Sequence, residues 1–181
     1  ARHANHMVET RSHTEYALKL SERRFQLALD ASQSHLWDLD MTSDVIVVGE
    51  GFYRTLGYTQ PVDGVPMQRF GSMFHSGDFA EMRSVLSSVD VQDKGISFEF
   101  RVRDNAGIYH WILTRGDIVE AGSDGAPKRA MGIMSDITER KRMEAQLLEY
   151  QKELRTLAAQ LSLAEEQERR IIATDLHDLV S

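Results

Sequence analysis

The sequence contains no cysteine and only three prolines. The lack of cysteine excludes disulfide bonds, a cysteine-ligated metal and thiol chemistry, including a covalent thiol–flavin adduct. It is also typical of a reducing compartment, so we expect a cytoplasmic location. No apolar run approaches the roughly 20 residues that span a bilayer. We therefore expect no membrane contact by this segment, and an anchor of any parent protein would lie outside it.

Positive charge is scarce as well. Lys and Arg number 21 against 28 Asp and Glu, which gives a net charge of −7. Such a chain has little electrostatic attraction for phosphate backbones, so we expect no nucleic-acid partner. A length of 181 residues with 41% hydrophobic content is enough for one core with extensions. Residues 1–7 have no apolar period, and we interpret them as a tag or linker.

The order of helix-like and strand-like segments along the chain predicts an α+β fold. Residues 8–30 lack Gly and Pro and favour an N-terminal helix. In residues 31–138, turn residues recur between alternating segments, and Phe98, Phe100 and Val102 alternate with charged residues as in a half-buried strand. Two short strands, a section of short helices broken by Gly and Pro, and then three strands indicate an α+β domain.

The C-terminal part predicts a long helix. Neither Gly nor Pro occurs after Gly132, and Asp136 and Glu139 have the spacing of a capping box. Apolar residues then recur in alternating steps of four and three, which predicts a coiled coil over residues 139–164. These residues are Met143, Leu147, Tyr150, Leu154, Leu157, Leu161 and Ala164. The alternative is a lone amphipathic helix packed on its own domain, but a helix of this length would span about 66 Å.

The apolar pattern changes phase near the end of this helix. A continued heptad would place Glu168 and Asp175 in the seam, whereas the apolar residues fall at Ile172, Leu176 and Leu179. A four-residue stutter has this effect and locally unwinds a coiled coil. Two competing packings in one helix are a physical basis for a switch.

Several segments together resemble a PAS domain. They are "LWDLD", "FEFRVRDNAGIYHWI" and "MGIMSDITERKRMEAQL", and the resemblance extends over residues 25–147. The resemblance implies a five-stranded antiparallel sheet that cups a pocket under short helices and senses a ligand or partner. The D-I-T motif of the family corresponds to Asp136, Ile137 and Thr138, which the resemblance implies couple the last strand to the outgoing helix.

Residues 165–181 resemble the phosphoacceptor box of a sensor histidine kinase, of the type with D-L-H-D. The match implies that His177 is the phosphoacceptor and Asp178 its neighbouring acid. An aspartate that orients one ring nitrogen leaves the other neutral and nucleophilic. The alternative is an exposed polar face, which would win on the His-Asp pair alone. A metal hydrolase of the HD type would need further His and Asp ligands on neighbouring helices, so we expect no metal site.

A kinase of this type also needs a second bundle helix and an ATP-binding domain. Both would follow residue 181, so we expect this sequence to be a piece of a longer protein and to be inactive alone. ATP and a response regulator are the partners expected of the full-length kinase. The alternative hypothesis is a PAS module for dimerisation or partner binding, whose scaffold helix leads to a different output domain.

Aromatic and Met residues are candidates for lining the pocket, although such residues are more often plain core. The candidates are Trp37, Phe52, Phe70, Phe74, Phe100, Trp111, Met131 and Met134. The ligand stays unknown. Non-covalent flavin is favoured over haem, because the helix before the third strand has no histidine to serve as an axial ligand. His35 is a further candidate for a ligand contact at the pocket mouth.

Two expectations concern assembly and signal output. A parallel homodimer would bury the stripe of Met143, Leu147, Leu154 and Leu161. At the junction, we expect the Asp136 carboxylate either to cap the helix or to pair with a basic residue of the neighbouring strand, for which Arg115 is the predicted partner. A switch between these two arrangements would couple the sensor to the helix.

Overall fold

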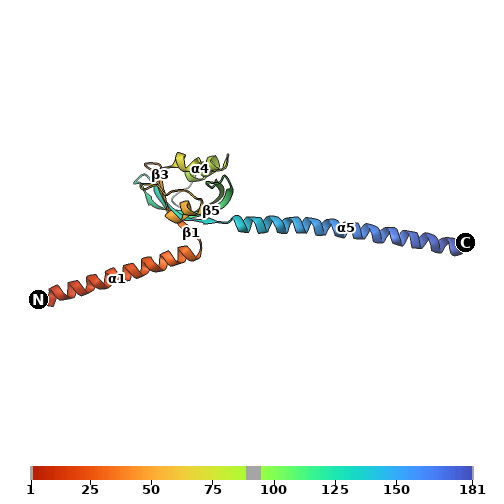
Figure 1. The fold of residues 1–181 in the computed structure, drawn as a ribbon, viewed down its shortest axis with the longest axis horizontal. Helices are drawn as coiled ribbons and strands as arrows, with labels where there is room; N and C mark the ends of the chain where they lie inside the picture. Colours follow the sequence, from red (N-terminus) through yellow and green to blue (C-terminus); the bar gives the residue numbers. More distant parts are fainter. Residues whose placement is uncertain (1, 89–94, 181) are drawn as a thin grey trace. The chain divides into compact units, whose positions relative to one another are not determined.

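The computed structural model describes residues 2–88 and 95–180, with side chains from 15 to 172 outside that gap. Its sheet has six antiparallel strands in the order β3-β2-β1-β6-β5-β4. Figure 1 shows this sheet together with α4, which lies beside it. The strands are β1 (Ser34–Asp40), β2 (Val45–Val48), β3 (Val65–Pro66), β4 (Ile96–Arg103), β5 (Tyr109–Ala121) and β6 (Pro127–Asp136). The predicted α+β class is therefore confirmed.

The sixth strand is the one difference in the sheet. Val65 and Pro66 pair with Ile46 and Val45 at the edge of the sheet. Proline suits an edge strand because it has no N–H to donate to a further neighbour. A strand of two residues is too short to show an alternation of apolar and polar side chains. The sequence therefore predicts five strands, whereas the structure has six.

The helices lie in the predicted regions, except that α1 also includes most of the residues interpreted as a tag or linker. They are α1 (Arg2–Ala31), α2 (Glu50–Thr55), α3 (Met67–Gly71), α4 (Asp78–Ser88) and α5 (Thr138–Val180). Contacts within the chain divide it into two compact units, and the first of them ends at Thr138. Among the described residues, no helix has both the length and the apolar character needed to cross a bilayer.

Turn chemistry fixes the hairpin between β4 and β5. Asp104 Oδ1 accepts hydrogen bonds from the backbone N–H groups of Ala106 at 2.9 Å and Ile108 at 2.8 Å. Gly107 follows with a φ of 88°, a conformation in which a side chain is strained. This turn sets the register that pairs Phe100 with Ile112.

The core lies between the inner face of the sheet and the short helices. It is rich in aromatic rings, and Phe74 stacks on Phe100 with ring centroids 4.4 Å apart. Asp78, at the start of α4, forms a forked ion pair with Arg101 of β4, with N–O distances of 2.7 and 3.0 Å. This pair fastens α4 to the strand beside it.

Candidate functional site: a sheet cavity and the strand-to-helix junction

A small cavity lies between the inner face of the sheet and α4. Its volume is about 20 Å³, and its walls include Trp37 of β1, Phe100 of β4, Thr114 of β5 and Met134 of β6, with Met82 of α4. Strands that are distant in sequence meet here because β6 lies between β1 and β5. Residues of the central strands β1, β6 and β5 therefore all contribute to the cavity wall.

The predicted pocket residues divide into three groups. Trp37, Phe100 and Met134 line the cavity. Phe52, Phe70 and Phe74 are buried in the aromatic core. Trp111 and Met131 are placed outside the cavity, which corrects the prediction for these two residues.

Strand alternation explains the correction. Phe100 pairs with Ile112, so the even-numbered residues Ile112 and Thr114 of β5 share the inner face. Trp111 therefore lies on the outer face, where the Arg101 guanidinium stands 5.1 Å from its ring centroid. On β6, Met134 and Met131 are three residues apart and so point to opposite faces, and Met131 is 38% exposed.

Two glycines make room for the Trp37 indole. Trp37 pairs with Gly132 on β6, and Gly132 pairs with Gly116 on β5, so the three residues form a row across the sheet. A Cβ at Gly132 would lie 2.7 Å from Trp37 Cζ2, and a Cβ at Gly116 would also collide with that atom. Atoms of the indole thus lie directly over both strands. A glycine inside a strand often marks such a close approach, and this signal was available in the sequence.

The cavity is too small for the cofactors considered from the sequence. A volume of about 20 Å³ is close to what one water molecule needs. Neither a flavin nor a haem ring fits it in this conformation, so we route no chemistry through either group. In the part of the chain whose side chains are described, no three His, Asp or Glu residues are arranged to hold a metal ion.

His35 stands beside the core and not on the cavity wall. Its ring meets Phe52 edge-on, with centroids 6.2 Å apart, and a Cβ at Gly51 would lie 2.7 Å from it. Burial lowers the pKa of the imidazole, because an apolar environment disfavours the charged form. The structure therefore gives His35 a packing role.

The D-I-T residues join the last strand to α5 through the backbone of β5. The N–H of Ile137 donates to Trp111 O at 2.8 Å, and the N–H of Trp111 donates to Thr138 Oγ1 at 2.9 Å. Asp136 Oδ1 accepts the N–H of Thr138 at 2.7 Å, which satisfies a free donor of the first helical turn. Asp136 is thus the cap, while the Thr138 hydroxyl serves the sheet.

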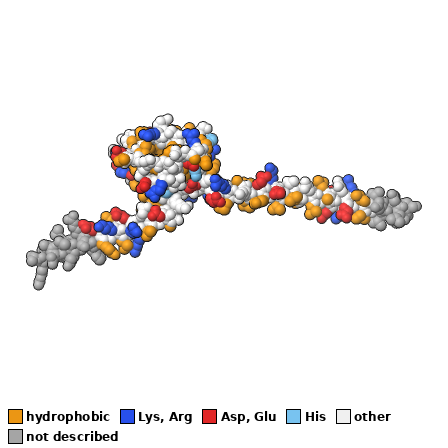
Figure 2. Space-filling view, in the orientation of Figure 1, with side chains coloured by type: hydrophobic (Ala, Val, Ile, Leu, Met, Phe, Trp, Pro, Cys, Tyr) orange, Lys and Arg blue, Asp and Glu red, His pale blue; other side chains and the backbone are white. Residues whose placement is uncertain are grey.

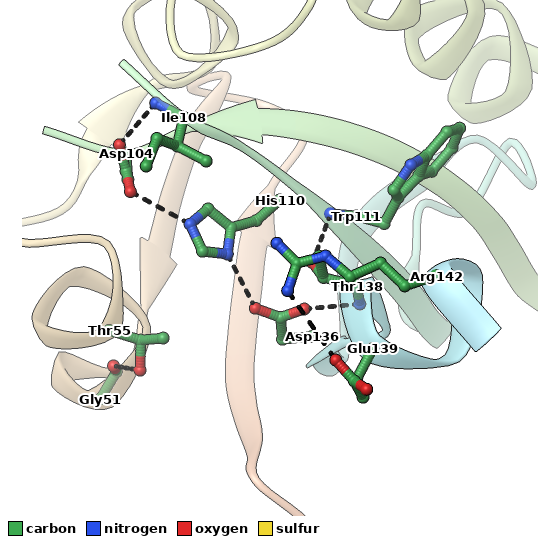
Figure 3. Close-up of polar contacts among 10 residues, drawn as sticks. All are labelled: Gly51, Thr55, Asp104, Ile108, His110, Trp111, Asp136, Thr138, Glu139 and Arg142. Carbon is green, nitrogen blue, oxygen red and sulfur yellow. Dashed lines mark hydrogen bonds and ion pairs between the residues drawn. The ribbon is translucent and has the colours of Figure 1, made fainter. Parts of the chain in front are cut away.

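The basic partner of Asp136 is His110, and Arg115 does not fill this role. Asp136 Oδ2 lies 3.1 Å from His110 Nδ1, and the other ring nitrogen lies 3.1 Å from Asp104 Oδ2 (Figure 3). The register places Arg115 opposite Ile133, three residues away from Asp136. Asp136 also caps and pairs at once, because each of its two oxygens takes one partner.

Hydrogen bonds hold the Asp104 carboxylate ionised in this cluster. Its pKa is lowered first by the backbone N–H of Ile108 and further by His110. Because both ring nitrogens of His110 face carboxylate oxygens, only the doubly protonated ring donates to both. The cluster links the β4–β5 turn to the start of α5.

The predicted phosphoacceptor residues lie near the end of α5. The backbone at His177 and Asp178 is helical, but their side chains lie outside the described residues. Further up the helix, the predicted seam residues Met143, Leu147 and Leu154 are 55 to 65% exposed. Figure 2 shows hydrophobic side chains along the described part of this helix.

Known proteins share this fold and part of the sequence. The model of the PAS fold family matches residues 45–134. A sensory box histidine kinase/response regulator from Burkholderia thailandensis is 30% identical, with a TM-score of 0.61, and the match covers 73% of this chain and 98% of that one. Among curated proteins, none matches the chain.

Two more distant structures agree in fold alone. The N-terminal domain of a diguanylate cyclase with a PAS/PAC sensor from Marinobacter aquaeolei is 16% identical, with a TM-score of 0.52, over 60% of this chain and 98% of that one. A domain of a histidine kinase from Haloarcula marismortui, described as light and redox sensing, is 20% identical, with a TM-score of 0.51, over 64% and 99%. The match to the PAS fold family and the 30% identical relative show that the chain belongs to the PAS family.

Proposed function

We propose that this PAS domain is the sensory module of a two-component sensor histidine kinase. In this proposal, a ligand or redox signal at the sheet passes through Asp136, Ile137 and Thr138 into α5 and reaches His177. The similarity to the Burkholderia sensory box histidine kinase supports the proposal, because that relative is 30% identical over 73% of this chain.

The observation that carries the proposal is the continuity of α5. One helix runs from Thr138, whose hydroxyl accepts a hydrogen bond from the sheet, to Val180, beyond the D-L-H-D segment. A rotation or tilt at its start is therefore passed along a helix without a Gly or Pro hinge. The length of α5 between Thr138 and His177 therefore does not by itself prevent the coupling of the sheet to His177.

The chemistry proposed for the end of the helix needs two residues. His177 would attack the γ-phosphate of ATP through a neutral ring nitrogen, which forms an N–P bond as ADP leaves. Asp178 would accept a hydrogen bond from the other ring nitrogen and take part in the proton transfer. An ATP-binding domain of the full-length kinase would bind the ATP, and a response regulator would then receive the phosphoryl group from His177.

The test is ATP-dependent labelling of the full-length protein with γ-labelled ATP. His177→Gln should abolish a label that is lost in acid and kept in base, as is typical of phosphohistidine. His75→Gln is a matched control outside α5 and should label normally. Labelling that survives His177→Gln would show that the phosphoacceptor is another residue.

The second candidate is a PAS module that only dimerises or binds a partner. The exposed stripe of α5 favours it as much as it favours the kinase, since either use would bury those residues. The Marinobacter protein has the same fold in a diguanylate cyclase, so the fold does not specify the output. A full-length protein that binds no ATP and takes no label would support this second candidate.

A further inference from the structure

Two residues that line the cavity each have a buried polar atom without a hydrogen-bond partner. Among the described residues, Trp37 Nε1 and Thr114 Oγ1 are the buried side-chain nitrogen and oxygen atoms that lack a hydrogen bond. Both residues line the same cavity, and they are 3% and 4% exposed. Buried polar groups in folded proteins are nearly always paired, so two unpaired groups at one cavity indicate that a bound molecule supplies their partner.

Packing holds the Trp37 indole in place, and Thr114 is buried on the same face of the sheet. The Trp37 indole lies against Gly132 and Gly116, where neither residue has a side chain to displace it. Thr114 is two residues before Gly116 on β5 and therefore shares its face of the sheet. Rigid donors cost little conformational entropy on binding, which is the usual advantage of a preorganised site.

The complementary atom is an uncharged oxygen. An indole N–H only donates, whereas a threonine hydroxyl both donates and accepts. An alcohol oxygen can accept from Trp37 Nε1 and share one hydrogen bond with Thr114 Oγ1. The cavity wall has no Asp, Glu, Lys, Arg or His among its described residues, so a charged ligand would lose its hydration without an opposite charge to replace it.

The rest of the wall suits a short apolar chain. Leu39, Ile46, Ile96 and Leu86 contribute aliphatic surface. Met67, Met82 and Met134 also line the cavity, and methionine is the side chain that adapts most easily to a new shape. The present volume of about 20 Å³ accepts the oxygen, and the flexible thioether chains have to move to admit carbon atoms.

We propose that this cavity binds a small, uncharged molecule that has a hydroxyl oxygen on a short apolar chain. Trp37 and Thr114 bind the oxygen, and the aliphatic and methionine side chains enclose the rest. The role of such a molecule as the sensed signal rests on the proposed function, whereas its binding does not. The site needs an indole over two glycines and a hydroxyl on β5, the strand on the far side of β6 from Trp37.

The probe is 1-butanol, titrated into the 181-residue chain while the indole N–H signals are followed by NMR. Trp111→Phe assigns the signal of Trp37, and the Trp111 signal of the unchanged chain is the internal control on the outer face. We expect a saturable shift of the Trp37 signal alone. Butyrate, which has a similar chain and a negative charge, should bind at least tenfold more weakly.

Variants at Thr114 separate the hydroxyl from the shape of the site. Thr114→Val should weaken 1-butanol at least tenfold, and Thr114→Ser, which restores the hydroxyl, should bring the affinity back to within a few fold. No saturable shift, equal binding of butyrate, or unchanged binding by Thr114→Val would each overturn the proposal. An NMR contact between water and the Trp37 N–H that persists at high 1-butanol concentration would also overturn the proposal, because the cavity would then hold water only.

The two proposals fail separately. Loss of His177 labelling as expected, together with no 1-butanol binding, would reject the ligand class and leave the kinase function standing. Binding as expected in a full-length protein that takes no label would reject the kinase function and leave the site standing. A change in labelling rate on adding 1-butanol, absent in Thr114→Val, would connect them.

Discussion

Asp136 Oδ2 lies 3.1 Å from His110 Nδ1 while the other oxygen of the same carboxylate caps the first turn of α5. One side chain therefore joins the β5 strand to the helix start. His110 in turn contacts Asp104 of the β4–β5 turn. A shift of β5 or of that turn would therefore move the contacts of the residue that caps α5, and we propose these contacts as the route from the sheet to the helix.

If the proposed kinase function is right, Asp136→Ala in the full-length protein should hold its labelling activity at one level, high or low, whatever the signal. The variant removes both the cap and the contact with His110, yet the loss in stability should be only about 1 kcal/mol because an exposed cap contributes little. Labelling rates with and without the signal, together with the melting temperature, test this prediction. Asp104→Asn is the comparison variant: it keeps the Asp136 cap, weakens the far side of His110 and leaves an amide oxygen to accept the two backbone N–H groups of the turn. A normal response by Asp136→Ala would place the coupling elsewhere.

Gly132→Ala should destabilise the domain by about 2 to 3 kcal/mol, because an overpacked site forces the backbone or the indole to move. A Cβ there would collide with Arg115 O and lie 2.7 Å from Trp37 Cζ2. Urea unfolding measures the loss. Gly49→Ala is the control, since the nearest atom to its Cβ would be 3.6 Å away. Equal losses in both variants would mean that the indole is not held by this glycine.

Stability should fall in acid through the pair of Asp78 and Arg101. The hydrogen bonds from the Arg101 side chain, as the main cause, lower the pKa of Asp78 below its ordinary value of 3.8. A carboxylate whose pKa is lowered by folding contributes its full stabilisation at pH values above the unfolded pKa. It loses this contribution as the pH falls through the folded pKa. We therefore expect the loss of stability below pH 4.

Asp78→Asn should lower the free energy of unfolding at pH 7 by about 2 kcal/mol and should flatten its dependence on pH below 4. Urea unfolding at a series of pH values measures both effects. Asp44→Asn breaks an ion pair with Arg83 in which both side chains are 48% exposed, and it should cost less than about 1 kcal/mol. An unchanged acid slope in Asp78→Asn would assign the acid sensitivity to other carboxylates.

A double substitution, Leu154→Asp with Leu161→Asp, should convert a dimer into a monomer. These residues are 65% and 63% exposed in the single chain, and a parallel coiled coil would bury each against its own copy. Light scattering on the 181-residue chain measures the mass. The matched control is Leu148→Asp with Leu163→Asp, at equally exposed positions outside the seam. Monomers in the control, or dimers in the first variant, would place the interface elsewhere.

Periodicity in the sequence predicted most of the fold. The alternation of Phe98, Phe100 and Val102 and the absence of breakers after Gly132 indicated β4 and α5, and both are present. The edge strand at Val65 was not predicted, because two residues have no period. Helix α1 also begins earlier than the expected 8–30, at Arg2.

The site was harder to predict, because it depends on register between strands. Alternation separates Met131 from Met134 but does not say which of them faces the cavity. Arg115 was expected beside Asp136, and the pairing of Ile112 with Asp136 brings His110 there instead. The unpaired Trp37 and Thr114 could not be found from sequence, since a hydrogen bond that is missing depends on every neighbour.

The bonds of Thr138 also bear on how such proteins can be recombined. The first compact unit ends at this residue, and its hydroxyl is bonded to the backbone of Trp111. An exchange of sensor domains that crosses over after Thr138 would keep the native interlock of sheet and helix, whereas a crossover before Asp136 would pair a foreign carboxylate with His110. Chimeras joined after Thr138, with helix lengths that differ by whole heptads, should then keep the phase of the helix that leaves the sensor. Thr138 is therefore a suitable crossover point for exchanging sensor domains.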